Sequence, residues 1–454
     1  MSPAQARLAR WLAARPGELR TAAASALLFF TVLAACFVLR PVRDEMGVQA
    51  GVHRLPTLVT WTLLAMLAAS VAFGGLVARL PRRRFLPLAL RAFALMLLGF
   101  AAWALAEQGT PSLAFAQAWF TWLSVFNMFV VALFWAFMAD TWRPEAAARL
   151  YGPIGVGGTL GAIAGGLCVP GLKALLGEGG LAPLLGGVFV LGALLLEACV
   201  HLVARVTRAA EAAGDEVAGP GPGAAERDRT VLGGGALEGL RALASSPYLA
   251  GAGLVVLLGS VLGSVLWSVR LQAVAASPLD ASARTALFSW SEVAAQSLTL
   301  LVQLVGTARV LPRLGTGPVL ALLPLAYAGF LLALGLVPGL VLAVVAVALT
   351  RATQFALAKP AQETLFSVVA RRDKYKAKSA LDTLGARLGD WLGSQGAGWV
   401  AGTLAAGPGP LALCAAPLCG LWLLLALAMG RARARRAAAG PPSAAGGDAA
   451  LADG

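Results

Sequence analysis

Apolar stretches of about 20 residues recur along most of the chain, separated by short segments rich in charge, glycine or proline. A helix needs roughly this length to cross the ~30 Å hydrocarbon core of a bilayer. The pattern therefore predicts an all-α integral membrane protein with twelve transmembrane helices. We place the spans at residues 21–45, 55–78, 86–106, 113–140, 151–174, 181–204, 247–269, 284–306, 318–336, 340–369, 379–405 and 410–429.

The spans fall into two six-helix halves, at residues 21–204 and 246–429. A polar segment between them, at 205–245, combines mixed charges with a Gly/Pro run and is typical of a flexible linker. Residues 1–20 form a predicted cytoplasmic arm. Residues 430–454 form a basic, then Ala/Gly/Pro-rich tail that we predict to be disordered and cytoplasmic.

The two halves repeat each other. Val38–Arg43 aligns with Val265–Arg270, and the same offset carries Arg149 onto Lys376. A linker at the midpoint and concordant matches on both sides predict a parallel two-half transporter of the major-facilitator type. Folds of this type place the substrate near the membrane midplane, so charged residues inside spans become candidates for function.

The composition agrees with a membrane protein. Mean hydropathy is +0.78 and only 13% of residues are charged, against about 25% in soluble chains. The net charge of +14 is best explained by basic residues on the cytoplasmic side, which argues against a nucleic-acid-binding protein. Only six basic residues fall in predicted exterior segments: Arg40, Arg43, Arg54, Lys173, Arg270 and Arg284. Both termini are then cytoplasmic, and the Ala/Arg/Gly-rich composition suggests a bacterial inner membrane.

No cofactor is expected. The five cysteines lie in apolar stretches without a CxxC pair, and the two histidines are far apart in sequence. We see no P-loop and expect no enzymatic activity. A monomer in the lipid bilayer, with a small-molecule substrate as its partner, is sufficient for this class.

The tenth predicted span contains Arg351, Lys359 and Glu363. A charge inside a membrane usually faces a cavity or a partner. Arg351 should lie near the midplane, which suggests substrate binding. Lys359 and Glu363 are one turn apart and can form a structural ion pair, or serve binding and gating. Pro360 should kink the helix.

Other spans also carry polar candidates. In the eighth, Ser289, Glu292, Gln296, Thr299 and Gln303 share one helical face, which should line an aqueous path. Glu292 is a candidate proton or cation site, or a structural residue. The remaining candidates are Asn127 in the fourth span and Asp382, Arg387 and Asp390 in the eleventh, where Arg387 and Asp390 can pair.

Glycines recur every fourth residue in the fifth span (Gly157, Gly161, Gly165) and in the eleventh (Gly385, Gly389, Gly393). Small residues at this spacing let two helices approach closely. We predict close helix packing at both stripes and no ligand role.

The first span ends in a charged block that runs from Arg40 to Glu45. Pro41 disfavours α geometry at Arg40, so the helix is expected to break there. Broken helices often build transporter binding sites. Alternatively, the span ends at Leu39 and these charges are an exterior flank. We retain Arg40 and Arg43 as candidate substrate ligands and Asp44 as a gating residue.

At three blocks the chain resembles the ATP/ADP translocase family of intracellular bacteria and plastids, which is related to the major facilitator superfamily. Leu39–Asp44 is similar to the family's Leu-Arg-x-x-Lys-Asp. The second block runs from Trp119 to Tyr151. The third comprises Lys359–Glu363 and then Lys374–Asp382, similar to Lys-x-Lys-x-Ala-Ile-Asp in the family.

The resemblance implies an exchanger of adenine nucleotides or related organophosphates. Arg43 would stand where the family has its substrate-contacting lysine, and Lys359, Glu363, Lys378 and Asp382 would be gating or binding residues. Basic groups such as Arg351 and Arg387 suit an anionic phosphate.

Three functions therefore stay open. The leading one is an alternating-access antiporter of nucleotides or similar organophosphates. A proton-coupled exporter of drugs or metabolites, with Glu292 or Asp390 as proton carrier, is the second. The third is a transport-silent scaffold or sensor, which would bind a partner through the linker or the tail.

Overall fold

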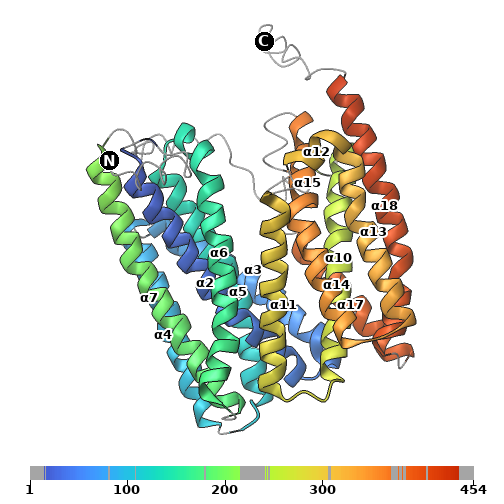
Figure 1. Ribbon diagram of the computed structural model, residues 1–454, viewed down its shortest axis with the longest axis horizontal. Coiled ribbons are helices and arrows are strands. Elements are labelled where there is room, and N and C mark those ends of the chain that lie inside the picture. The colour runs from blue at the N-terminus through green and yellow to red at the C-terminus, as the bar shows by residue number, and fades with distance from the viewer. Residues whose placement is uncertain are drawn as a thin grey trace, which may run out of the picture. The chain divides into compact units, whose positions relative to one another are not determined.

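The computed structural model describes residues 15, 17–79, 82–107, 109–177, 180–214, 241, 243, 246–304, 308–369, 377, 381, 385–404 and 407–438. Every regular element among them is helical (Figure 1). Ten of these helices are long and apolar enough to cross a membrane. The other two long helices, α11 and α17, contain the polar residues noted above. The fold is all-α, with twelve helical segments at the predicted spans.

The first six long helices are α2 (Leu19–Gln49), α3 (Leu55–Arg79), α4 (Arg82–Ala106), α5 (Leu113–Thr141), α6 (Pro144–Leu176) and α7 (Leu181–Ala213). The next six are α10 (Pro247–Ala275), α11 (Ala281–Val302), α13 (Thr316–Leu336), a tenth helix of several segments, α17 (Ala386–Leu404) and α18 (Pro408–Ala438). Two short helices, η1 (Val52–Arg54) and α12 (Ala308–Leu314), lie in connections.

The tenth helix is not uniform. It consists of α14 (Leu340–Thr353), the π-helical segment η4 (Gln354–Ala358), α15 (Lys359–Leu365) and the 3₁₀ turn η5 (Phe366–Val368). We predicted an irregularity at Pro360, and the structure places it one turn earlier. Proline lacks an N–H and clashes with the carbonyl four residues before it, and the wider π turn contains that carbonyl. Pro360 itself lies in the first turn of α15.

The structure extends the internal repeat to whole helices. A shift of 227 residues carries α2 to 246–276, α5 to 340–368 and α7 to 408–440. The helices found there are α10 at 247–275, the α14-to-η5 run at 340–368 and α18 at 408–438. Each half is therefore one copy of the same six-helix pattern.

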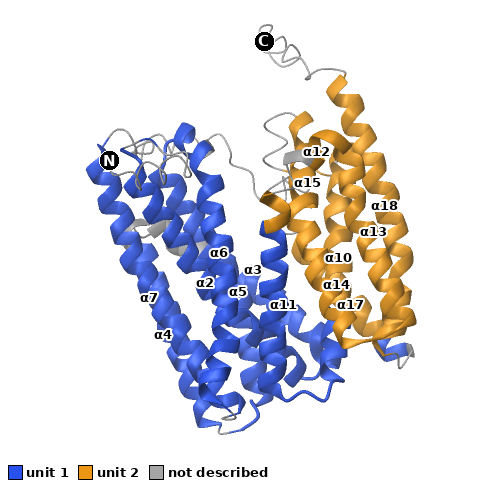
Figure 2. Ribbon diagram, viewed as in Figure 1, with its two compact units in different colours: residues 1–227, 268–300, 401–403 blue, residues 228–267, 301–400, 404–454 orange. Residues whose placement is uncertain are grey.

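The chain forms two compact units (Figure 2). Unit 1 contains α2 to α7, the end of α10 and α11, as residues 1–227, 268–300 and 401–403. Unit 2 contains the start of α10 and the helices from α12 onward, as residues 228–267, 301–400 and 404–454.

Both predicted glycine stripes pack closely against another helix, except at Gly385, which among the described residues is near only Leu381 of its own segment. In unit 1, a methyl group on Gly161 would clash with the carbonyl oxygen of Phe30 on α2, and one on Gly157 would lie 2.7 Å from that of Ala26. In unit 2, a methyl group on Gly389 would lie 2.5 Å from Cβ of Ser260 on α10. The equivalent helix pairs, α2 with α6 and α10 with α17, thus use the same small-residue device.

Candidate functional site

The charged block of the first span lies inside a continuous helix. We expected Pro41 to break the helix, but α2 runs from Leu19 to Gln49 through Pro41, so the predicted break is wrong. The alternative, that these charges flank the membrane on its exterior side, stays a prediction. Pro41 removes one backbone hydrogen bond. The surrounding turns compensate by packing, since Leu39, Val42 and Met46 are all 0% exposed.

Asp44 on α2 forms a buried ion pair with Arg270 on α10. Their exposed fractions are 3% and 1%. The second Nη of Arg270 donates to the Ser291 hydroxyl of α11 at 3.1 Å, and the guanidinium stacks on the Phe288 ring, 5.1 Å from its centroid. Burial of an ion pair is unfavourable unless further hydrogen bonds satisfy the charged groups. Ser291 on α11 supplies one such bond to Arg270, whose Nε has no hydrogen-bond partner among the described residues.

Glu45, the next residue on α2, holds Arg284 of α11. Nε and Nη2 of Arg284 donate to the two carboxylate oxygens at 3.0 and 2.6 Å. Gln49 donates to the same carboxylate at 2.8 Å. This two-pronged geometry is the strongest form of a carboxylate–arginine contact.

A third ion pair joins α2 to α11 one turn earlier, where Arg40 Nε lies 3.7 Å from Glu292 Oε1. Arg40 is partly accessible, with 31% of its side chain exposed, whereas Glu292 has 2%. Arg43 is half-buried and stacks over Phe120 of α5, 4.4 Å from the ring centroid. Four arginines and three carboxylates thus gather on α2, α10 and α11 within unit 1, and we call these seven residues the α2 cluster.

The polar face of α11 is packed against protein at its start. Ser289 is fully buried and donates to the carbonyl of Gly166 on α6 at 2.5 Å. Glu292 meets Arg40, as described above. The expectation that this face lines an aqueous path is therefore wrong at Ser289 and Glu292, because both side chains are buried against α6 and α2.

Unit 2 has its own polar group around Tyr327 of α13. The Tyr327 side chain is hydrogen-bonded to Thr350 and lies within electrostatic reach of Arg351 and Asp390. Arg351 is half-buried in the last turn of α14, just before the π-helical segment. Helices α13, α14 and α17 thus bring these four residues together from separate parts of the sequence.

Asp390 also contacts Arg387, one turn away on α17, as predicted. The Arg387 Nη1–Asp390 Oδ2 distance is 3.5 Å, and the side chains are 42% and 43% exposed. Ser264 of α10 donates to the Asp390 carbonyl at 2.8 Å. Both partners of this ion pair are half-exposed, whereas the three carboxylates of the α2 cluster are buried.

The remaining candidates are placed as follows. Lys359 is exposed and Glu363 half-buried on α15, and their pairing stays a prediction. Asn127 is half-buried on α5. Lys378 and Asp382 lie outside the described residues.

The sequence interpretation missed Arg270, Arg284, Glu45 and Tyr327. We assigned Arg270 and Arg284 to exterior loops, whereas α10 and α11 include them. Hydropathy ends a span at its first charge, so an arginine neutralised by a distant carboxylate is misplaced. One signal was present, because the repeat aligns Arg270 with Arg43, a residue that we had selected.

No protein-family model matches the chain, and no curated protein matches it in sequence. Solved structures do resemble it. One is a crystal structure of the nucleoside transporter NupG, with 16% sequence identity and a TM-score of 0.60. The match covers 93% of this chain and 100% of the NupG chain.

A second similar structure is that of a bacterial homologue of the human lysosomal transporter Spinster, in an inward-facing, unoccupied conformation. It is 15% identical, covers 95% of this chain and 100% of its own, and has a TM-score of 0.56. At these identities the likeness shows the fold alone, which this chain shares with both transporters. The narrower resemblance to ATP/ADP translocases stays a prediction.

Proposed function

We propose that this protein is an alternating-access membrane transporter of small organic phosphates, with nucleotide exchange as the leading case. The observation that carries the proposal is a set of charged residues inside helices long enough to span a membrane. Charged groups in such positions are unfavourable unless they serve a substrate, an ion or a conformational change.

The choice of a phosphate substrate rests on the kind of charge. Arg40 and Arg43 are half-buried in unit 1, and Arg351 and Arg387 are half-buried in unit 2. Guanidinium groups bind phosphate oxygens through two parallel hydrogen bonds. Lys359, at the start of α15, adds a compact ammonium, and the π-helical segment η4 separates it from α14 and Arg351. A nucleotide carries several negative charges, so several such groups are needed.

The carboxylates have a complementary role in this proposal. Glu292 neutralises Arg40 in the structure, and Glu363 and Asp382 would do the same for nearby basic groups when no substrate is bound. Substrate phosphate would then compete with a carboxylate for an arginine. Asp44 and Asp390 would serve as gating residues, because each forms an ion pair with an arginine of its own unit. Asp44 pairs with Arg270, and Asp390 pairs with Arg387.

Counterflow in proteoliposomes tests the proposal. Vesicles are loaded with ADP, labelled ATP is added outside, and empty vesicles are the control. We expect uptake that requires internal nucleotide. Since a similar fold belongs to a nucleoside transporter, adenosine is the informative competitor. Adenosine lacks phosphate, so it should compete far less than ADP, and equal competition would contradict the phosphate assignment.

A proton-coupled exporter is the second candidate. It is favoured by Glu292, a carboxylate with 2% of its side chain exposed beside Arg40. Uptake or efflux driven by a pH gradient, and abolished in Glu292→Gln or Asp390→Asn, would support it. Transport that survives both changes excludes it.

A silent scaffold or sensor would depend on the linker or the tail, most of which lie outside the described residues. Deletion of residues 439–454 should leave transport unchanged under the leading proposal. Loss of all function on that deletion would favour the scaffold.

A further inference from the structure

The C-terminal end of α18 is anchored to the rest of unit 2 by two of its arginines. Arg433 Nε donates to the carbonyl of Thr364 on α15 at 3.0 Å. Arg436 stacks on the Tyr248 ring of α10, 4.3 Å from its centroid, and the Tyr248 hydroxyl donates to the Leu365 carbonyl at 2.7 Å. These contacts fix which face of α18 turns outward.

Two further arginines on the same helix end face outward. Arg431 and Arg435 are exposed and one turn apart. Like charges at this spacing repel each other in a helix. Gly430 packs against Gly317 at the start of α13. The short helix α12 ends at Leu314, just before α13, and carries the exposed Arg313. Arg313 therefore belongs to the segment that adjoins this end of α18.

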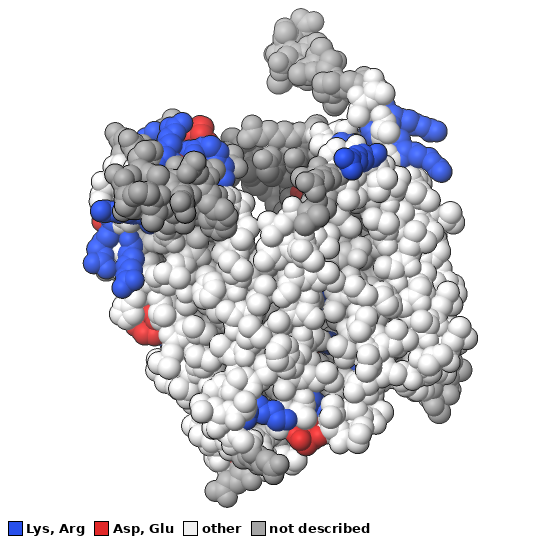
Figure 3. Space-filling model, viewed as in Figure 1, with Lys and Arg blue, Asp and Glu red and all other residues white. Residues whose placement is uncertain are grey.

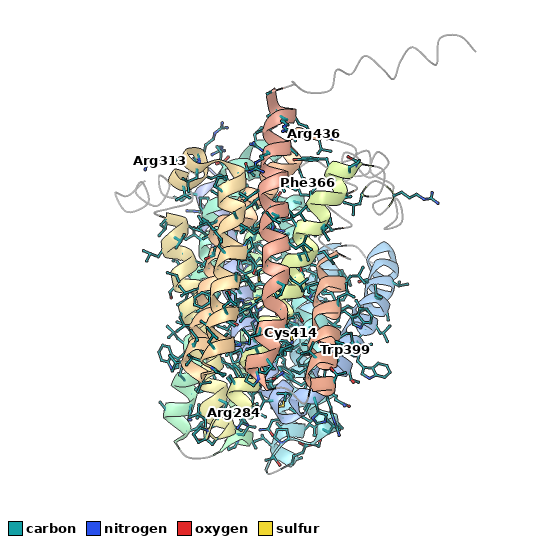
Figure 4. All side chains as sticks on the ribbon, turned by 90° about the vertical axis from the view of Figure 1, so that its right-hand side faces the viewer. Arg284, Arg313, Phe366, Trp399, Cys414 and Arg436 are labelled. Atoms are coloured by element: carbon teal, nitrogen blue, oxygen red, sulfur yellow. The ribbon has the colours of Figure 1, made fainter. Side chains whose placement is uncertain are left out.

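The figures show this arrangement. Basic side chains gather on the end of α18 in the space-filling view (Figure 3). Arg313 and Arg436 lie at the same end of unit 2 in the stick view (Figure 4). Three exposed arginines, which we call the α18 patch (Arg313, Arg431 and Arg435), therefore belong to one end of one unit.

The position of the α18 patch along the helix matches the boundary of a membrane. α18 has 31 residues, or roughly 46 Å at 1.5 Å per residue, which exceeds the ~30 Å hydrocarbon core. The apolar part of α18 begins at Pro408 and ends near Met429, two residues before Arg431. Leu421 and Leu424, 53% and 68% exposed, lie on the apolar side of that boundary.

We propose that the α18 patch binds the phosphate of an anionic phospholipid headgroup. The phosphate neutralises the repulsion between Arg431 and Arg435, and the acyl chains lie along the exposed leucines of the same helix. This apolar surface directly beside the arginines favours a lipid over a free phosphate ion. Basic clusters at the end of a membrane-spanning helix attract anionic lipids for the same physical reason.

Lipid binding here would bear on the tenth helix. Arg433 holds Thr364, and Thr364 also contacts the Thr316 hydroxyl at 3.0 Å. Helix α15, which carries Lys359 and Glu363, thus ends within the anchored region. The lipid site itself does not depend on what the protein transports.

Native mass spectrometry of the full-length protein in detergent tests the site, with phosphatidylglycerol and phosphatidylcholine as probes. We expect the wild type to retain phosphatidylglycerol preferentially. Arg431→Gln with Arg435→Gln should reduce that affinity by roughly tenfold or more. Arg431→Lys with Arg435→Lys should retain most of it, because lysine keeps the charge.

The matched control is Arg205→Gln with Arg208→Gln, which removes two exposed arginines from the end of α7. An equal loss in that control would mean general charge attraction and would overturn the site. Displacement of phosphatidylglycerol by millimolar inorganic phosphate would also overturn it, in favour of a free-anion site. Single Arg435→Gln, which removes one exposed side chain, provides the same comparison if the double variant fails to fold.

Discussion

The charged groups of the two units differ in the exposed fraction of their side chains. In the α2 cluster, the side chains of Asp44, Glu45, Arg270 and Glu292 are all 5% exposed or less. In unit 2, Arg387 and Asp390 are 42% and 43% exposed, and their contact is 3.5 Å long. Both groups lie within the same fold, yet the first pairs each of three buried carboxylates with an arginine and the second is half-exposed on both sides.

This difference suggests two roles. A buried ion pair resists separation because each charge would be left buried without its partner. A half-exposed pair is screened by water and exchanges partners readily. We therefore propose that the buried pairs Asp44–Arg270 and Glu45–Arg284 hold α2 against α10 and α11. The more exposed arginines of both units, Arg40 and Arg43 in unit 1 included, remain available to a soluble anion. The following changes test that division.

The largest effect is expected at the buried pair of Asp44 and Arg270. Asp44→Asn leaves Arg270 charged and buried, which should lower stability by about 3–5 kcal/mol. Thermal unfolding in detergent, followed by tryptophan fluorescence, measures this. Asp44→Asn combined with Arg270→Gln removes both charges and should recover part of the loss. If the single and double variants lose the same stability, the pair is not the cause.

The second effect concerns close helix packing at the glycine stripes, where added methyl groups should destabilise both units to a similar degree. Gly161→Ala and Gly393→Ala place a methyl group against the carbonyl oxygens of Phe30 and Val261. Each should destabilise by roughly 1–3 kcal/mol. Gly155→Ala, which has open space around it, is the control and should change stability little. A tolerated Gly161→Ala would contradict the close α2–α6 packing.

A smaller effect is expected at Asp280, which caps the first turn of α11. Hydrogen bonds from the Ser282 hydroxyl and the Ala283 N–H hold the pKa of Asp280 below its ordinary value of 3.8. The carboxylate therefore stabilises the folded state above that pH, and the stabilisation is lost as the pH falls through the lowered pKa. Asp280→Ala should lose about 1 kcal/mol at neutral pH.

The difference between wild type and Asp280→Ala should shrink below pH 3.8. Asp280→Asn keeps a capping oxygen but no titratable carboxylate, so the stability difference between Asp280→Asn and Asp280→Ala should not change with pH in this way. A pH-independent Asp280→Ala penalty would show that the carboxylate charge is not involved.

The smallest effect is expected at the exposed pair. Arg387→Gln should change the free energy of unfolding by less than about 1 kcal/mol, because exposed ion pairs contribute little. Chemical denaturation at low and high salt measures it, and any loss should disappear in salt. A loss as large as that of Asp44→Asn would remove the distinction between the two units.

The sequence predicted the features that follow from periodicity. The twelve helical segments, both glycine stripes and the Arg387–Asp390 contact all follow from spacing within one helix, and the structure confirms them. The failures involve partners far apart in the chain. Arg270 and Arg284 meet Asp44 and Glu45 more than 220 residues away, and no local pattern reveals such a pairing.

The helix break predicted at Pro41 was wrong for a related reason. Proline before the helix end is a local signal for a break, but the packing of α2 in the core overrides it. Tyr327 was missed because a single tyrosine in an apolar span looks like any core residue. Only the arrangement of α13, α14 and α17 places it beside Thr350, Arg351 and Asp390.

The most direct test of the account is ADP-loaded counterflow of labelled ATP with Arg351→Gln beside Arg205→Gln. Arg351 lies in the polar group of unit 2, whereas Arg205 is an exposed arginine at the end of α7. The account predicts uptake in the wild type and in Arg205→Gln, and a loss of at least tenfold in Arg351→Gln, with normal folding. No uptake of any nucleotide by the wild type, or full uptake by Arg351→Gln, would contradict it.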